Sequence, residues 1–125
     1  MVDRATAGVI VNVGSVAGYK ASPGLAPCGA ATAARVQLTK TLALELAPHG
    51  IRVTAVAPGM ADTESLREFL SDEDLAVRAK RIPAGRIAAP EDIGKVVVLL
   101  ASDLAGWVYG RTLIADGGEL LSQEG

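Results

Sequence analysis

Unbroken runs of β-branched and small apolar residues recur along the chain and alternate with longer stretches of helical periodicity. Three such runs cover residues 9–13, 51–57 and 112–115. Each ends in turn-forming residues: Gly14-Ser15, Pro58-Gly59 and Asp116-Gly117-Gly118. Short apolar runs bounded in this way are typical of strands buried in a parallel sheet. We therefore predict three strands.

Apolar residues recur with helical spacing in two stretches between these runs. In residues 28–47 they repeat every fourth position, at Ala34, Leu38, Leu42 and Leu46. Pro48-His49-Gly50 is expected to end this helix. A second helix is predicted from Pro90, with a buried stripe at Ile93, Val96, Val97 and Leu100. Strand, helix and strand in this order predict a right-handed parallel crossover.

Residues 62–88 differ from the rest because charged side chains are dense there and apolar ones are sparse. This composition indicates short helices with little apolar surface to bury. We interpret the segment as a mobile, lid-like structure over the edge of the sheet.

Composition supports one α/β domain. The chain has 125 residues, of which 50% are hydrophobic and only 3% aromatic, so Ala, Val, Leu and Ile form its apolar part. This mixture suits a parallel sheet covered by Ala-rich helices. The expected architecture is a partial Rossmann-like fold with three mainly parallel strands and flanking helices, in a single domain over residues 1–125.

Charge and cysteine content exclude several classes of partner. Twelve Lys and Arg against 14 Asp and Glu give a net charge of −2, which argues against binding nucleic acid through phosphate contacts. One Cys and one His are too few for a metal site. Apolar runs are too short to span a membrane. We expect a cytoplasmic protein without nucleic-acid, membrane or metal partners.

Several segments together resemble the carboxyl-terminal half of the short-chain dehydrogenase/reductase family. They are residues 9–15 with Gly18, residues 42–47, residues 50–53, Pro58-Gly59 with Thr63, and Asp116-Gly117-Gly118. The resemblance covers nearly the whole chain, in the family's order and spacing. It begins just before the family's fifth strand, so we interpret the chain as a truncated family domain. It contains no G-x-G-x-x-G turn, and we therefore expect no cofactor.

The resemblance also implies where the family's catalytic residues would fall. Ser15 matches the family's Ser, but thirteen residues later the family's Tyr is replaced by Cys28, and four residues on its Lys is replaced by Thr32. In the family the Tyr is the general acid/base and the Lys lowers its pKa and holds the cofactor ribose. A hydroxyl carries no charge and a thiol is shorter than a phenol. We therefore predict that hydride transfer is lost.

Candidate site residues are expected to meet at the carboxyl edge of the sheet, where open α/β sheets bind ligands. We take Ser15, Cys28 and Asp62 as candidate catalytic residues. Each also has a structural interpretation: a backbone-capping Ser, a Cys that packs where the family has Tyr, and a solvated carboxylate. The inherited cofactor positions, Pro58, Gly59 and Thr63, are alternatively a turn retained for folding.

Four cations follow in the lid-like segment, at Arg78, Lys80, Arg81 and Arg86. They either close over an anionic ligand or form a solvated helix face. Trp107 and Tyr109, near the last strand, are interpreted as interface residues.

An exposed strand edge and uncovered apolar helix faces favour association, so we expect a homodimer or larger homo-oligomer. Three functions stay open. The first is cofactor-independent binding of an apolar small molecule, with or without non-redox acid/base or cyclisation chemistry. The second is a non-catalytic protein that assembles with itself or with an intact family member. The third is an NAD(P)-dependent oxidoreductase fragment completed by another chain.

Overall fold

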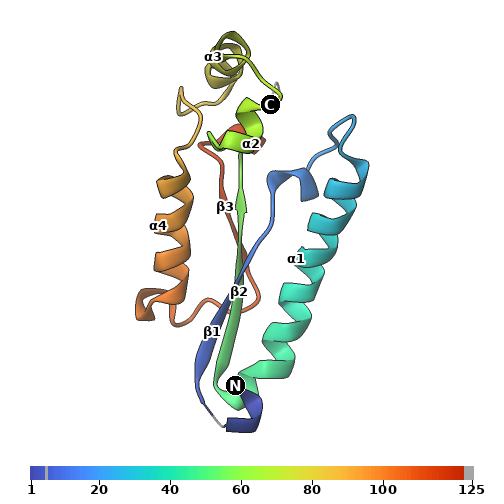
Figure 1. Ribbon diagram of the computed structural model, residues 1–125. Helices are drawn as coiled ribbons and strands as arrows, with labels where there is room; N and C mark the ends of the chain where they lie inside the picture. Colours follow the sequence, from blue (N-terminus) through green and yellow to red (C-terminus); the bar gives the residue numbers. More distant parts are fainter. Residues whose placement is uncertain (5, 123–125) are drawn as a thin grey trace.

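The computed structural model describes residues 1–4 and 6–122 and contains one parallel sheet (Figure 1). Its strands are β1 (Gly8–Val13), β2 (Ile51–Pro58) and β3 (Thr112–Ala115), in the spatial order β1-β2-β3. Val13 pairs with Val56, and Val56 in turn pairs with Leu113. The three parallel strands confirm the predicted α/β class.

The two long helices cover opposite faces of this sheet (Figure 1). They are α1 (Ala26–Leu46) and α4 (Pro90–Ala101). Between them, every residue of β2 from Ile51 to Ala57 is buried. Ala43 of α1 packs with Ile51 and Val53 on one face, and Leu100 of α4 packs with Val56 on the other. The central strand is therefore the core of the fold.

The buried face of α1 follows the fourfold repeat only in part. Leu42 and Leu46 pack against the core, but Leu38 is 51% exposed, whereas Thr32, Thr39 and Ala43 are buried. The Thr39 hydroxyl donates to the Arg35 carbonyl and accepts from the Asn12 amide of β1. Small residues face the sheet because they allow the helix backbone to approach it closely, so residue size decides this face more than hydrophobicity does.

Two shorter helices lie beyond the carboxyl ends of the strands, α2 (Glu64–Arg67) and α3 (Asp72–Arg81) (Figure 1). In α3, Ser71 and Asp74 form a reciprocal capping box. Leu75 and Ile82 are the buried apolar side chains here. Single 3-10 turns complete the fold at Val2–Arg4, Val16–Gly18, Ala47–His49, Asp103–Ala105 and Glu119–Leu121.

An arginine lies inside the core. Arg52, the second residue of the central strand β2, is 6% exposed. Its guanidinium donates to the Leu100 carbonyl at 2.6 Å and to the Ser102 carbonyl at 3.0 Å. Leu100 lies in the last turn of α4 and Ser102 is the C-cap of that helix. The negative end of the helix dipole lies here, and the last carbonyls of a helix lack intrahelical donors. The strand thus supplies a cationic cap to the helix.

Within residues 1–4 and 6–122, no helix combines the length and apolar character that crossing a membrane requires.

Candidate functional site

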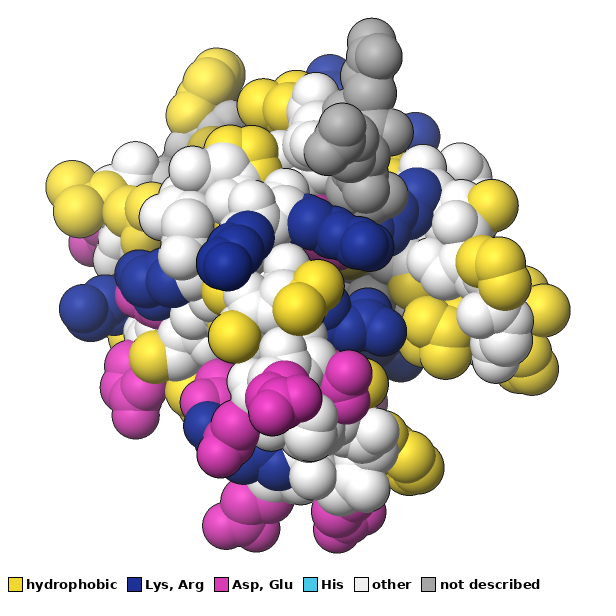
Figure 2. Space-filling view, turned by 90° about the horizontal axis from the view of Figure 1, so that it is seen from above, with side chains coloured by type: hydrophobic (Ala, Val, Ile, Leu, Met, Phe, Trp, Pro, Cys, Tyr) yellow, Lys and Arg dark blue, Asp and Glu magenta, His cyan; other side chains and the backbone are white. Residues whose placement is uncertain are grey.

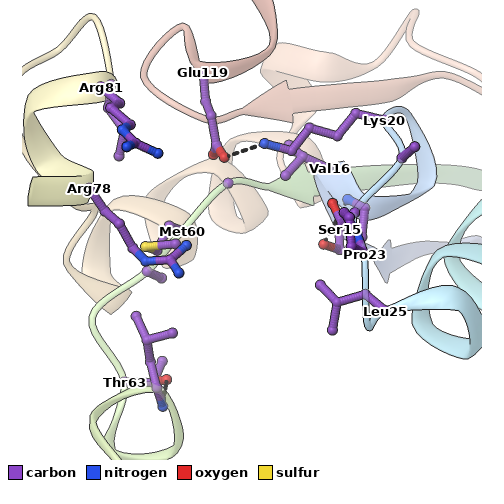
Figure 3. A pocket seen from close by; sticks show the side chains of 17 residues that line it. Ser15, Val16, Lys20, Pro23, Leu25, Met60, Thr63, Arg78, Arg81 and Glu119 are labelled. Atoms are coloured by element: carbon purple, nitrogen blue, oxygen red, sulfur yellow. Dashed lines mark hydrogen bonds and ion pairs between the residues drawn. The ribbon is translucent and has the colours of Figure 1, made fainter. Parts of the chain in front are cut away.

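A cavity of about 680 Å³ opens at the carboxyl end of the sheet, between the 3-10 turn Val16–Gly18 that follows β1 and helix α3 (Figure 3). Its polar and charged lining includes Ser15, Lys20, Thr63, Arg78, Arg81 and Glu119. Its apolar lining includes Val16, Leu25, Met60, Leu66 and Ile82. Cavities of this size that combine an apolar wall with a few convergent polar groups suit small organic ligands.

Ser15 lies where β1 gives way to the 3-10 turn Val16–Gly18. Its side-chain oxygen accepts a hydrogen bond from the Ala17 N–H at 3.1 Å, so the residue caps that turn. A hydroxyl also carries one hydrogen that it can donate. Capping therefore uses the acceptor of Ser15 and leaves its donor for a ligand oxygen in the cavity.

Gly59 and Thr63 form the opposite part of the floor, directly after β2. A Cβ atom at Gly59 would lie 2.8 Å from the Cβ of Asp116 and 2.8 Å from Oε2 of Glu119, so only glycine fits this close approach. Thr63 caps α2 by accepting from the Leu66 N–H at 3.2 Å. Like Ser15, it keeps a hydroxyl hydrogen to donate.

An ion pair in the wall of the cavity joins two residues that are far apart in the chain. Lys20 Nζ lies 2.7 Å from Glu119 Oε1, and the two side chains are 27% and 13% exposed (Figure 3). Glu119 Oε2 is buried and has no hydrogen-bond partner among the described residues. Partial burial weakens solvent screening of this pair, so the ammonium and carboxylate fix each other at the wall of the cavity.

Two arginines of α3 line the side of the cavity that faces Ser15 and Lys20. Figure 3 shows the Arg78 and Arg81 side chains reaching from the helix toward the cavity. No ion pair joins either of them to a carboxylate within the part of the chain that the structure describes.

The structure places Cys28 and Thr32 outside this cavity. Cys28 is exposed in the first turn of α1 and is not one of the cavity's lining residues. Thr32 is 8% exposed, and its hydroxyl donates to the backbone carbonyls of Cys28 and Gly29. The hydroxyl of Thr32 is therefore committed to the helix backbone.

Asp62 is also turned away from the predicted cluster. Its two carboxylate oxygens accept from Nε and Nη2 of Arg67, at 2.7 and 2.8 Å. The hydrogen bond from Arg67, followed by its charge, holds the pKa of Asp62 below its ordinary value. The structure brings Ser15 and Thr63 to the cavity, whereas Cys28 and Asp62 do not line it.

Residues 1–119 match the family described as enoyl-(acyl carrier protein) reductase. The chain belongs to the short-chain dehydrogenase/reductase family. It is 45% identical over 115 residues to a 3-oxoacyl-[acyl-carrier-protein] reductase of Haemophilus influenzae, covering 92% of this chain and 47% of that protein. It is 44% identical over 120 residues to 3beta-hydroxysteroid dehydrogenase 1 of Eggerthella lenta, covering 95% and 46%.

Solved structures of short-chain dehydrogenase/reductase proteins share the fold. A putative short-chain alcohol dehydrogenase from Sinorhizobium meliloti superposes with a TM-score of 0.87 and 41% identity, over 95% of this chain and 48% of that one. A structure named ribose-5-phosphate isomerase, from Brucella melitensis, gives a TM-score of 0.90 and 37% identity over 99% and 48%. The chain thus spans about half the length of the relatives it matches.

The sequence pattern of this short-chain dehydrogenase/reductase chain does not predict the ion pair Lys20–Glu119. The two residues are 99 positions apart, and neither belongs to a segment that carries the family resemblance. The one available signal was the close spacing of Glu119 to the Asp116-Gly117-Gly118 turn, which returns the chain to the carboxyl edge of the sheet.

Proposed function

We propose that this chain binds a small organic molecule in the cavity between Ser15 and Thr63, without a nicotinamide cofactor and without hydride transfer. The observation that carries the proposal is the separation of two sets of residues. Hydrogen-bond donors and an apolar wall meet in the cavity, while the residues at the family's Tyr and Lys positions lie outside it.

The residues at those two positions supply neither group that the family's reaction uses. Cys28 presents an exposed thiol beside the cavity, and Thr32 presents a buried hydroxyl that is already bonded to two carbonyls. General acid/base catalysis needs the proton-transferring group within hydrogen-bond reach of the substrate. No ammonium one turn along α1 from Cys28 is available to stabilise a thiolate or phenolate there.

The cavity retains groups for binding and for polarising a ligand. The hydroxyls of Ser15 and Thr63 can each donate to a carbonyl or hydroxyl oxygen of the ligand. The Lys20–Glu119 ion pair also belongs to the lining and adds an ammonium donor and a carboxylate acceptor. Any chemistry beyond binding would be non-redox acid/base chemistry, in keeping with these groups.

Amide chemical shifts under titration with organic fragments test the proposal. We expect shifts to concentrate at Ser15, Gly59 and Thr63. Ala21→Trp places an indole at the mouth of the cavity, where Ala21 is an exposed lining residue, and should abolish the shifts. Ala30→Trp, at an exposed position of α1 outside the cavity, is the matched control. Equal binding by both variants would contradict the proposed site.

A second candidate function is assembly with another copy or with a full-length family member. It is favoured by the outer edge of β1, which has no strand partner among the described residues, and by Trp107 and Leu104, which are 95% and 87% exposed. Unpaired edges and apolar patches are association sites. Light scattering after size exclusion tests it: we expect a dimer or larger, and a compact monomer would contradict self-assembly.

A further inference from the structure

We propose that the ligand of this cavity is an amphiphilic anion. An oxyanion head, a carboxylate or a phosphate ester, would be held by Arg78 and Arg81, and a short apolar body would lie against Met60, Ile82 and Leu25. This inference rests on the proposed binding function and specifies the class of ligand that the same cavity takes.

The charge of the lining favours an anionic ligand. Three cations and one carboxylate, Lys20, Arg78, Arg81 and Glu119, are its formally charged residues, so the lining carries a formal charge of +2. The whole chain has a net charge of −2. The cavity is therefore opposite in sign to the protein that surrounds it, which attracts anions to this face.

One of these three cations is already neutralised by a carboxylate, and two are not. Lys20 is held by Glu119, so its charge is balanced. Arg78 lies one turn from Asp74, but that carboxylate accepts from the N–H and hydroxyl of Ser71, which are the main causes of its lowered pKa, and the charge of Arg78 adds a smaller effect. Arg81 has no ion-pair partner among the described residues. Two guanidinium groups thus remain to bind a ligand.

The positions of the two arginines allow them to bind one ligand together. Arg78 and Arg81 are three residues apart on α3, so their side chains leave the same face of the helix. Both reach toward the cavity from the side that faces Ser15 and Lys20 (Figure 3). Figure 2, which views this end of the molecule, shows Lys and Arg side chains gathered around its middle and acidic ones to one side. Planar guanidinium groups bind oxyanions through paired hydrogen bonds.

The apolar lining limits the rest of the ligand. Ile82 is buried and belongs to the lining, and Met60 and Leu25 lie on either side of the cavity (Figure 3). An inorganic anion would leave this wall exposed to water, whereas a short alkyl or ring body would cover it. The wall and the two arginines together therefore favour an organic anion over a free inorganic one.

Titration calorimetry with matched six-carbon probes tests the inference. The probes are hexanoate, hexyl phosphate and the neutral hexanamide, with inorganic phosphate as a fourth arm. We expect either anion to bind at least about tenfold more tightly than the amide, because hydrogen bonds to charged groups contribute about 1.5–3 kcal/mol each. The tighter of the two anions identifies the head group, and inorganic phosphate alone should bind more weakly than hexyl phosphate.

Charge-removing variants locate the binding groups. Arg78→Gln and Arg81→Gln should each weaken anion binding by about tenfold and leave hexanamide binding unchanged. Lys80→Gln, on the same helix but outside the lining, removes an equal charge and should change little. All three positions are exposed, so we expect the variants to fold, and circular dichroism checks this.

The outcomes separate this inference from the proposed function. Equal affinity for hexanamide and the anions, or equal effects of Arg81→Gln and Lys80→Gln, would overturn the anionic ligand while leaving small-molecule binding intact. If none of the organic probes or a wider fragment set shifts the cavity amides, both proposals fail.

Discussion

The central strand and the lid-like segment are stabilised by different kinds of contact. All seven residues from Ile51 to Ala57 are buried in β2, and apolar contacts with α1 and α4 hold the strand on both faces. In residues 62–88 two apolar side chains, Leu75 and Ile82, are buried. The segment is also held by helix caps, by exposed ion pairs and by backbone hydrogen bonds such as the one from the Ala84 N–H to the Gly117 carbonyl.

This difference separates folding from binding. Exposed ion pairs contribute little stability each, so we expect α2 and α3 to open without unfolding of the sheet. The cationic residues that line the cavity, Arg78 and Arg81, belong to α3, whereas Ser15 and Gly59 follow the ends of strands. We interpret the cavity as a rigid floor faced by an adjustable wall.

The largest effect is expected when the sheet loses core volume. Leu100 is 2% exposed and packs with Val56 and Ala105. Leu100→Ala should lower the free energy of unfolding by about 2–5 kcal/mol, because the core cannot close over the cavity that it leaves. Urea denaturation measures this loss. Leu44→Ala, at an 81% exposed position of α1, is the control, and an equal loss there would contradict the assigned core.

A smaller effect is expected from Arg52, which joins the strand to α4. Arg52→Met keeps most of the side-chain volume but removes the donors to the Leu100 and Ser102 carbonyls. The Ser102 carbonyl keeps the Ala105 N–H at 3.2 Å, but the Leu100 carbonyl loses its Arg52 donor in a buried environment, which should lower the free energy of unfolding by about 1–3 kcal/mol. Arg111→Met, at an exposed position, should be nearly neutral. If the two variants unfold at the same urea concentration, the capping role of Arg52 is wrong.

A core substitution in the lid-like segment should change hydrogen exchange in that segment alone. Leu75→Ala removes one of the two buried side chains of that segment, and we expect faster hydrogen exchange across α3 with unchanged protection in β2. The global free energy of unfolding should change by less than about 1 kcal/mol, because α3 opens before the sheet does. Loss of β2 protection in step with α3 would show that the two regions unfold as one unit.

The smallest effect concerns pH. Hydrogen bonds from the Arg86 guanidinium and the Ala89 N–H lower the pKa of Asp92 from 3.8 to about 2. A carboxyl with a lowered folded-state pKa stabilises the fold above its unfolded-state value and loses this contribution as pH falls through the folded-state value. Asp92→Asn should therefore lower stability at neutral pH, and the difference should shrink between pH 3.8 and about 2. A constant difference across that range would contradict the assignment.

Local pattern was sufficient to predict the sheet and its two covering helices. The predicted strand over residues 51–57 is observed as β2 (Ile51–Pro58), and the helix over residues 28–47 as α1 (Ala26–Leu46). Apolar runs and turn residues determine such elements within a few neighbouring positions. The buried face of α1 was mispredicted at Leu38, because close packing against the sheet selects small residues that a hydrophobicity pattern does not rank highly.

The candidate site was predictable only where the chain turns at a strand end. Ser15, Gly59 and Thr63 lie within five residues of a strand end and line the cavity. Asp62 follows the same strand as Thr63, but Arg67, five residues on, binds its carboxylate. Pairing between side chains depends on their rotamers and on tertiary contacts, which a linear pattern does not contain. For the same reason the pair Lys20–Glu119 could not be predicted.

Calorimetric titration of the purified 125-residue chain with NADH and NADPH tests the central claim most directly, with the six-carbon anions titrated in parallel. We predict no saturable heat from either dinucleotide at millimolar concentration, and saturable binding of an organic anion that Ala21→Trp abolishes. A micromolar Kd for NADH or NADPH would contradict cofactor-independent binding.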